Sequence, residues 1–444
     1  MTINDFGTHQ LILACQFFLL GSVVTCELLS RRKNFFALIV ALAILLLIHG
    51  QAAWIFAKFY EEGQFELVIG YHALTWASIK QANIIYLWTV CAFVFGWAIF
   101  RLLKRSYKVS ETSQRKFRFG WLGHTLVSIW LIIMAIALIK NAGGLEVAVT
   151  QPGQLIGGQT VLLLAVSIAK WPLLCRVIFF QKLRLMDVLL FLGALLMLLL
   201  NSRFLTCFAV LQVLLAIHYC RTELKIRWLA IMAVPAFLIL IVFGVYREFG
   251  HRKAMEADNF VAFKDTNFDT LDWFYNNNVE GFAGVSGIIE RELSSGLSHD
   301  YGLSQAAILL RYIPNSIRND PNLPFLKWEE TLKGVFPYDR SVVPSGFELS
   351  YGHFGPSGMV SYGLCLGILC GLFHSQARLR TFSGIFCLII GIQLLNGVRG
   401  SLMGAIMFFG LADLLAFAVI YCLGKWLPHR VSRSAPALSC PLTL

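Results

Sequence analysis

The sequence has few charged residues and no motif for holding a metal or a nucleotide. Only 14% of its 444 residues are charged, against 57% hydrophobic, and the mean hydropathy is +0.68. Because a soluble domain carries about a quarter charged residues, this composition excludes an ordinary soluble protein. Metal-ligand clusters, a phosphate-binding glycine loop and a dinucleotide fingerprint are also absent from the sequence, so we expect neither a metal nor another cofactor.

Cysteine is absent from the longest polar segment, residues 247–353, although the chain has 11 cysteines. This segment therefore cannot be stabilised by an internal disulfide. It holds 10 Lys+Arg and 15 Asp+Glu, so the formal net charge of +12 leaves +17 for the rest of the chain. Most of that excess lies in short loops between apolar runs, which is the positive-inside pattern of a membrane protein. No basic face with interleaved aromatics is present, so a nucleic-acid partner is not expected.

Apolar runs of spanning length predict an all-α polytopic membrane protein with about 11 transmembrane helices. A polar segment of about a hundred residues cannot sit in hydrocarbon, so we expect one large, mostly helical loop on one face. With the first basic loop in the cytoplasm, every basic cluster falls on that side, which puts the N-terminus outside and the C-terminus inside. The predicted divisions are helices one to eight over 1–246, the loop over 247–353, helices nine to eleven over 354–424 and a tail over 425–444.

Two predicted hairpin tips resemble each other, LLLNSRFLT with Asn201 and Arg203, and LLNGVRGSL with Asn396 and Arg399. In each, an apolar run leads to an asparagine, then an arginine, then another predicted helix. An arginine beside the capped N-terminus of a helix is a favourable phosphate site, with a bidentate fork and backbone donors. The alternative is an arginine that extends to lipid headgroups. The predicted topology puts both tips and the long loop on the same face.

The long loop contributes further candidates. Helices are predicted over 280–293 and 300–312, with His299 before the second and Arg311 in its last turn. Arg311 either binds a ligand or stabilises the end of its helix, and His299 is either catalytic or structural. Arg247, where helix eight leaves the membrane, is a phosphate candidate or an interfacial anchor.

The segment GFELSYGHFGPSG leads into helix nine, which we expect to begin near Phe354. Its glycines and Pro356 predict a tight turn there. Glu348, partly desolvated at the membrane surface, can act as a general base, and His353 lies five residues later. The alternative is that Glu348 only orients an arginine such as Arg247 or Arg399.

At these residues the chain resembles the O-antigen polymerase (Wzy) family of bacterial inner-membrane proteins. The resemblance covers the architecture, with a large periplasmic loop before the last helices. It also covers three short matches: NSRF and NGVRGS, RYIPNSIRNDP, and FELSYGHFGPSG. Phe204 departs from the family, where a small residue often follows the first arginine.

The resemblance implies a glycosyltransferase that polymerises undecaprenyl-diphosphate-linked oligosaccharide repeat units without a metal. Arg203, Arg399 and either Arg247 or Arg311 would hold the departing diphosphate, with Asn201 and Asn396 beside the two tips. Glu348 would be the base, with His353 or His299 in reserve. Membrane lipid, a chain-length regulator and a flippase are the expected partners. The alternatives are an O-antigen ligase, which shares the architecture, a transporter or flippase of the polysaccharide, and a scaffold.

Overall fold

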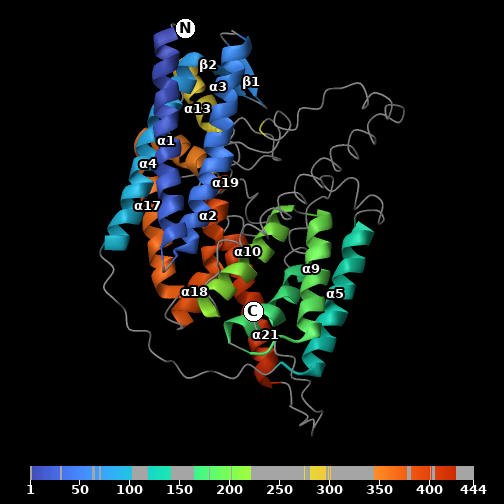
Figure 1. The fold of residues 1–444 in the computed structure, drawn as a ribbon. Helices are drawn as coiled ribbons and strands as arrows, with labels where there is room; N and C mark the ends of the chain where they lie inside the picture. The colour runs from blue at the N-terminus through green and yellow to red at the C-terminus, as the bar shows by residue number, and fades with distance from the viewer. Residues whose placement is uncertain are drawn as a thin grey trace, which may run out of the picture. The chain divides into compact units, whose positions relative to one another are not determined.

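The computed structural model is almost entirely helical in the part of the chain that it describes (Figure 1). The described residues are 3–30, 33–62, 66–69, 72–102, 119–141, 165–179, 181–201, 203–221, 275, 281–296, 299, 301, 345–377, 382–400, 402 and 406–426. The chain forms two compact units. Unit 1 comprises Met1–Thr112 and Val210–Leu414, and unit 2 comprises Ser113–Ala209 and Leu415–Leu444.

Among the described residues, five helices are long and apolar enough to cross a membrane, and each coincides with an apolar run that predicts a span. They cover Asp5–Leu29, Phe35–Tyr60, Trp76–Leu102, Trp121–Lys140 and Gly346–Ala377. The same part of the chain has three shorter apolar helices, two of them on either side of the predicted tip at Asn201 and one after the predicted tip at Asn396: Leu185–Leu199, Leu205–Cys220 and Leu411–Gly424. These helices agree with an all-α membrane protein. The predicted eighth helix, Arg247 and Arg311 lie outside the described residues.

The second predicted span consists of three joined segments, α2 (Phe35–Ala43), η1 (Ile44–His49) and α3 (Gly50–Glu62). Asn34 begins it as an N-cap, because its side chain accepts a 3.1 Å hydrogen bond from the amide of Ala37. The middle segment η1 is a π-helix, which widens the turn locally and which the hydropathy pattern does not predict.

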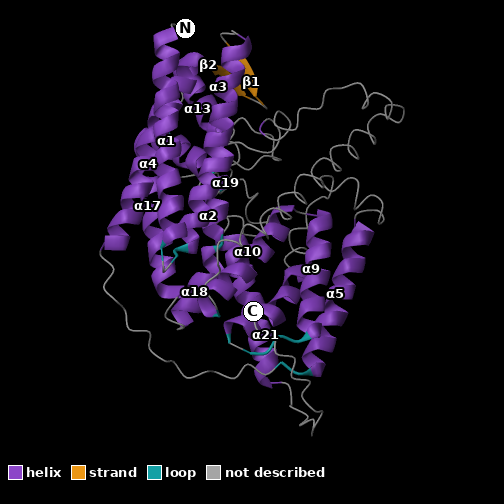
Figure 2. Cartoon of the chain, in the orientation of Figure 1, coloured by secondary structure: helices purple, strands orange, loops and turns teal. Residues whose placement is uncertain are grey.

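The span is followed by a hairpin that the sequence analysis does not predict. Strands β1 (Glu66–Ile69) and β2 (His72–Thr75) pair antiparallel, with Glu66 opposite Thr75 (Figure 2). The hairpin leads directly into α4 (Trp76–Leu102). Glu290 accepts a short hydrogen bond from the Thr75 hydroxyl, so the hairpin contacts a residue of the long polar segment.

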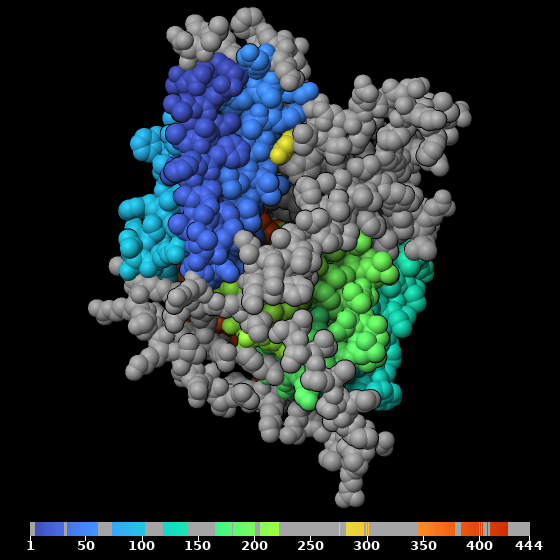
Figure 3. Space-filling view, viewed as in Figure 1, coloured from blue at the N-terminus to red at the C-terminus, as the bar shows by residue number. Residues whose placement is uncertain are grey.

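Helix α1 (Ile3–Leu29) packs along α4 and keeps a second face outward. Gln16 on α1 donates to the backbone and side-chain oxygens of Asn83 on α4, at 2.7 and 3.0 Å. On the other face Leu11 and Phe18 are exposed, and α1 forms an outer surface of unit 1 in Figure 3. An outward apolar face is what a membrane-spanning helix presents to lipid.

Helix α17 (Gly346–Ala377) makes its most extensive packing contact with α4. Gly363, Gly367 and Gly371 recur every fourth residue on the face toward α4, and a Cβ at any of them would overlap α4 atoms. Small residues at this spacing let two helix backbones approach closely, as they do in membrane helix pairs. The sequence YGLCLGILCG shows this glycine repeat, but a hydropathy analysis does not detect it, because it measures only how apolar a run is.

Helix α17 is broken at Gly355, which has φ 67° and ψ −155°, and Pro356 follows. This backbone region is accessible essentially to glycine alone. The second part of α17 begins where helix nine was predicted. The preceding residues were predicted as part of the water-facing loop, but Gly346–His353 form a buried helical segment. Their small and aromatic side chains pack inside the protein, so polarity alone misplaced the boundary.

Helix α13 (Gly281–Ser295) matches the helix predicted over 280–293, yet Gly281–Ile289 are entirely buried. Its N-terminus is held inside unit 1, because the Gln51 side-chain oxygen accepts from the amides of Phe282 and Ala283 at 2.9 and 3.1 Å. The long polar segment therefore does not fold wholly apart from the spans. Its apolar run FAGVSGII lies against α4 and α17.

The remainder of unit 1 includes α18 (Phe382–Gly391), α19 (Gln393–Arg399) and η6 (Ile406–Gly410), and α21 (Leu411–Trp426) follows. In unit 2, a buried cluster joins the helix ends. Asp187 accepts a 2.8 Å hydrogen bond from His124 and forms an ion pair with Arg176. The cluster residues belong to α5 (Trp121–Asn141), α8 (Trp171–Ile178) and α9 (Leu185–Asn201). The short helix η3 (Ile168–Lys170) precedes α8, and α10 (Arg203–Cys220) follows α9 and belongs to unit 2 only up to Ala209.

Candidate functional site

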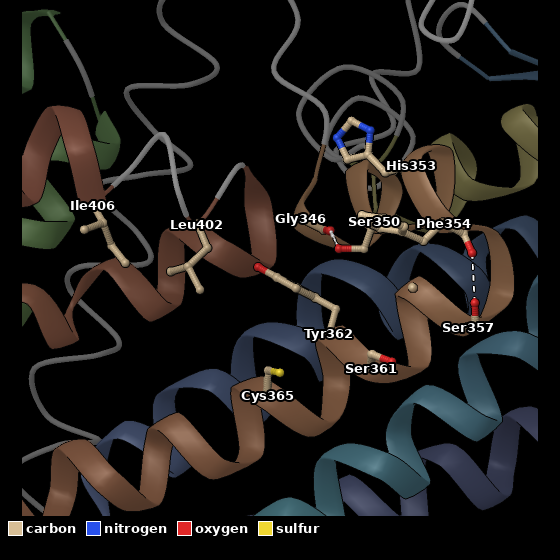
Figure 4. A pocket seen from close by; sticks show the side chains of 11 residues that line it. Gly346, Ser350, His353, Phe354, Ser357, Ser361, Tyr362, Cys365, Leu402 and Ile406 are labelled. Carbon is tan, nitrogen blue, oxygen red and sulfur yellow. Dashed lines mark hydrogen bonds between the residues drawn. The ribbon is translucent and has the colours of Figure 1, made fainter. Parts of the chain in front are cut away.

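An open pocket of about 590 Å³ lies in unit 1, beside the break in α17 (Figure 4). Its polar lining residues are His353, Ser350, Ser357, Ser361 and Tyr362. Its apolar lining includes Phe354 and Cys365 of α17, and Leu402 and Ile406 from the chain after α19. The volume falls within the range of about 300–1,000 Å³ that is usual for small-molecule sites.

Helical spacing explains why these side chains share the pocket. Gly346, Ser350, His353 and Phe354 follow one another at intervals of four, three and one, which puts them on one face of the first segment of α17. The break at Gly355 then turns the chain. The second segment therefore presents its own first turns to the same space.

Three backbone carbonyl groups at the break contact groups outside the helical hydrogen-bond ladder of α17, and one of them, that of Gly352, has lost its usual helical donor. Pro356 has no N–H, so the Gly352 carbonyl instead faces His299 Nδ1 at 3.2 Å. The His353 carbonyl accepts from the Tyr301 amide at 3.0 Å. The Phe354 carbonyl accepts from the Ser357 hydroxyl at 2.9 Å. Residues 299 and 301 thus hold the turn that carries His353.

His299 is itself fixed by acidic and aromatic groups. Its Nε2 lies 3.0 Å from a carboxylate oxygen of Glu292, and the other oxygen accepts a 2.5 Å hydrogen bond from Tyr351. Both ring nitrogens of His299 therefore face oxygen atoms, of the Gly352 carbonyl and of the Glu292 carboxylate. Tyr301 has φ 52°, an uncommon value for a residue with a side chain. The sequence predicted His299 as a catalytic reserve, whereas here it holds the helix break and does not line the pocket.

Glu348 lies on a different face of the first α17 segment. Its side chain is 0% exposed and accepts from the Ser345 amide at 3.2 Å, while the Ser345 hydroxyl accepts from the Glu348 amide at 3.1 Å. This reciprocal pair is a capping box at the N-terminus of α17. A Cβ on Gly284 of α13 would overlap the Glu348 carboxylate. The structure thus brings Glu348 against α13, whereas His353 is one of the residues that line the pocket.

The second arginine tip lies at a helix end. Arg399 is the last residue of α19, since Gly400 is extended with φ −147° and its amide bonds back to the Asn396 carbonyl at 2.6 Å. The helix predicted to begin after this tip falls on residues 401–405, of which only Leu402 belongs to the described residues, so it stays a prediction. The Asn396 side chain donates to Gln393 at 2.5 Å instead of capping a new helix.

The backbone of this tip nevertheless adjoins the pocket. Tyr362, which lines the pocket, donates a 2.7 Å hydrogen bond to the Gly397 carbonyl. A Cβ on Gly346 would also overlap that carbonyl, so the start of α17 and the end of α19 meet there. Arg399 lies two residues further along the chain; its side chain lies outside the described residues.

The first arginine tip has the predicted backbone. Helix α9 ends at Asn201 and α10 begins at Arg203, so the chain breaks at the predicted place. The side chains of Asn201 and Arg203 lie outside the described residues, as do Arg247 and Arg311 entirely. This tip belongs to unit 2, whereas the pocket and Arg399 belong to unit 1.

The sequence analysis missed the hydroxyl groups of the pocket. Ser350, His353, Ser357 and Ser361 lie three or four residues apart in the sequence. A helical projection of this stretch would therefore have placed the three serines on the same face as His353. In the described part of the chain, no group of three His, Cys, Asp or Glu residues is arranged to hold a metal ion. No family model matches the chain, and no curated protein or solved structure matches it either.

Proposed function

We propose that this chain is a glycosyltransferase that polymerises undecaprenyl-diphosphate-linked oligosaccharide repeat units at the periplasmic face of a bacterial inner membrane. The proposal includes eleven transmembrane helices, a periplasmic N-terminus and a cytoplasmic C-terminus. The observation that carries it is the pocket at the break of α17. That pocket places a buried imidazole and several hydroxyl groups in a helix that is otherwise long and apolar enough to span a membrane.

The proposed reaction is a displacement at the anomeric carbon of the growing chain. The acceptor sugar hydroxyl forms the new bond to that carbon, and the bond to the lipid diphosphate breaks with its electron pair leaving on the phosphate oxygen. A base removes the acceptor proton. Because no metal is proposed, arginines must stabilise the departing diphosphate, and Arg399 and Arg203 are the first candidates, with Arg247 and Arg311 behind them.

We assign the base to His353 in preference to Glu348. His353 is 1% exposed and lines the pocket, whereas the Glu348 carboxylate occupies the capping box and faces α13. A base must lie within hydrogen-bond reach of the proton that it removes, so a pocket residue has the advantage. His299 and Glu348 then act as positioning residues that fix the two ends of the first α17 segment.

A broken helix inside a spanning segment also favours a second function. Discontinuous helices form the substrate sites of many secondary transporters, so α17 is compatible with a flippase or transporter of the same lipid-linked sugar. An O-antigen ligase-like transferase would share the chemistry and differ only in its acceptor.

The test compares surface polysaccharide from a strain lacking the chain and complemented with His353→Ala, Arg399→Ala, Arg203→Ala or the unmodified sequence. Loss of long chains with single repeats still attached to lipid A core would support the polymerase. Loss of single repeats as well would favour the ligase or the transporter, which are separated by whether repeats accumulate on the periplasmic or cytoplasmic face.

The control is Cys422→Ser, a change at an exposed position of α21 that is not among the residues lining the pocket. All variants must reach the membrane at equal abundance. A full ladder of chain lengths in the His353→Ala and Arg399→Ala strains would refute the proposed site.

A further inference from the structure

Three of the four hydroxyl groups in the pocket wall already donate a hydrogen bond to a backbone carbonyl; the exception is Ser361. Ser350 donates to the Gly346 carbonyl at 2.7 Å, and Ser357 donates to the Phe354 carbonyl at 2.9 Å (Figure 4). Tyr362 donates to the Gly397 carbonyl at 2.7 Å. A hydroxyl group has a single hydrogen, so each of these three oxygens can offer only lone pairs to an occupant of the pocket.

These acceptor oxygens therefore favour a ligand that donates hydrogen bonds to the pocket wall. Oxygen lone pairs attract hydrogen-bond donors and repel phosphate oxygens, which are acceptors themselves. No Lys or Arg is among the described residues that line the pocket. A diphosphate would thus meet acceptors here, whereas a sugar ring, which carries several O–H donors, would meet partners for them.

The rest of the lining agrees with an uncharged occupant. Phe354, Leu402 and Ile406 supply apolar surface, which suits the C–H faces of a sugar ring and not a charged group. His353, the base assigned above, is among the residues of the same wall.

We propose that this pocket is the acceptor-sugar subsite: it binds an uncharged, hydroxyl-bearing sugar ring, and the lipid diphosphate binds outside it. The proposal rests on the glycosyltransferase function proposed above and divides the site into two parts. The sugar that receives the chain lies against Ser350, Ser357, Tyr362 and His353. The charged leaving group lies toward the arginines.

Cys365 lines the pocket and is exposed, so its thiol reports on occupancy. The test uses full-length protein in nanodiscs in which Cys365 is the only cysteine, the other ten being changed to serine. The rate of maleimide labelling is measured with four probes that share an octyl tail: octyl glucoside, octyl phosphate, octyl trimethylammonium and octyl tetraethylene glycol ether, each below its micellar concentration.

Octyl glucoside is expected to slow the labelling of Cys365 about tenfold at roughly ten times its Kd, with the other three probes much weaker. A matched protein with Cys422 of α21 as its only cysteine should be labelled at the same rate with and without each probe. Ser350→Ala and Ser357→Ala should each weaken protection by octyl glucoside about fivefold, the effect of losing one neutral hydrogen bond.

Three results would overturn the proposal. Equal or better protection by octyl phosphate would make the pocket a phosphate site. Equal protection by the glycol ether would make it a hydrocarbon site, and the strongest protection by the ammonium probe would make it a cation site. The enzymatic function fails separately: protection by octyl glucoside with normal polysaccharide in the His353→Ala strain would leave a sugar pocket without the proposed catalysis.

Discussion

Removing the imidazole of His299 tests whether its contacts with the Gly352 carbonyl and Glu292 maintain the conformation of the pocket. In His299→Ala, the buried Gly352 carbonyl loses its donor, because Pro356 cannot replace it. The Glu292 carboxylate loses its partner at the same time and keeps only Tyr351 among these residues. The second segment of α17 would then be free to shift relative to the first.

The expected loss of stability is set mainly by the carbonyl. A buried polar group left unpaired costs about 1–3 kcal/mol. The His299–Glu292 pair is 24% and 20% exposed, so its loss adds less than about 1 kcal/mol. We predict that His299→Ala lowers the free energy of unfolding by about 2–3 kcal/mol, and that His299→Asn, whose amide can still donate to Gly352, loses much less.

A double-mutant cycle with Pro356→Ala isolates the proposed cause. Alanine restores an N–H at position 356, the group that a continuous helix would pair with the Gly352 carbonyl. The loss caused by His299→Ala should therefore shrink in the Pro356→Ala background, as measured by thermal unfolding in nanodiscs. Equal losses in both backgrounds, or an Asn variant as weak as the Ala variant, would refute this reasoning.

Three further changes test the packing. Gly367→Ala should destabilise the protein by about 1–3 kcal/mol, because the new Cβ overlaps α4. Gly21→Ala, whose Cβ meets nothing within 4 Å, should stabilise it by about 0.5–1 kcal/mol. Thermal unfolding measures both changes, and a change of stability in the same direction for both variants would contradict the close helix contact. Neither ring nitrogen of His49 has a hydrogen-bond partner among the described residues, so His49→Phe should raise the free energy of unfolding by about 1 kcal/mol, and a fall would indicate another role for the imidazole. Asp187→Ala removes the carboxylate that forms the ion pair with the buried Arg176 side chain in unit 2 and should cost about 3–5 kcal/mol, measured by denaturant titration; a loss below about 1 kcal/mol would show that the cluster is not stabilising.

The helices could be predicted because the hydrocarbon interior of a membrane requires spanning helices of a certain length and apolar composition. Each such helix is visible in the sequence as one apolar run. All five helices long enough to span lie where apolar runs predicted them, and the chain breaks after Asn201 as expected. The glycine–proline pair at the break of α17 was also legible, since no other residue adopts the backbone of Gly355 easily. These features depend on local sequence alone.

Features that depend on partners distant in sequence were not predicted. Gln51 caps α13 across more than two hundred residues, and this bond draws an apolar stretch of the polar segment into the interior. At the helix break, the carbonyls of Gly352 and His353 contact residues 299 and 301, and no sequence periodicity connects these positions. Likewise, NGVRG resembles NSRF in sequence, yet Arg399 is the last residue of a helix, whereas Arg203 is the first residue of one.

The two predicted roles of Glu348, base or orienting residue, are separated by one conservative change. Glutamine keeps the size of the side chain and an oxygen that can accept from the Ser345 amide, so it can complete the same capping box, but it cannot take a proton as a base. We therefore predict that Glu348→Gln still supports long-chain polysaccharide, while Glu348→Ala and Ser345→Ala each lower the free energy of unfolding by about 1 kcal/mol. If Glu348→Gln instead abolished long chains in a protein as stable as the unmodified one, the carboxylate itself would be required. His353 would then lose its assignment as the base, because a capping role tolerates the amide and proton removal does not.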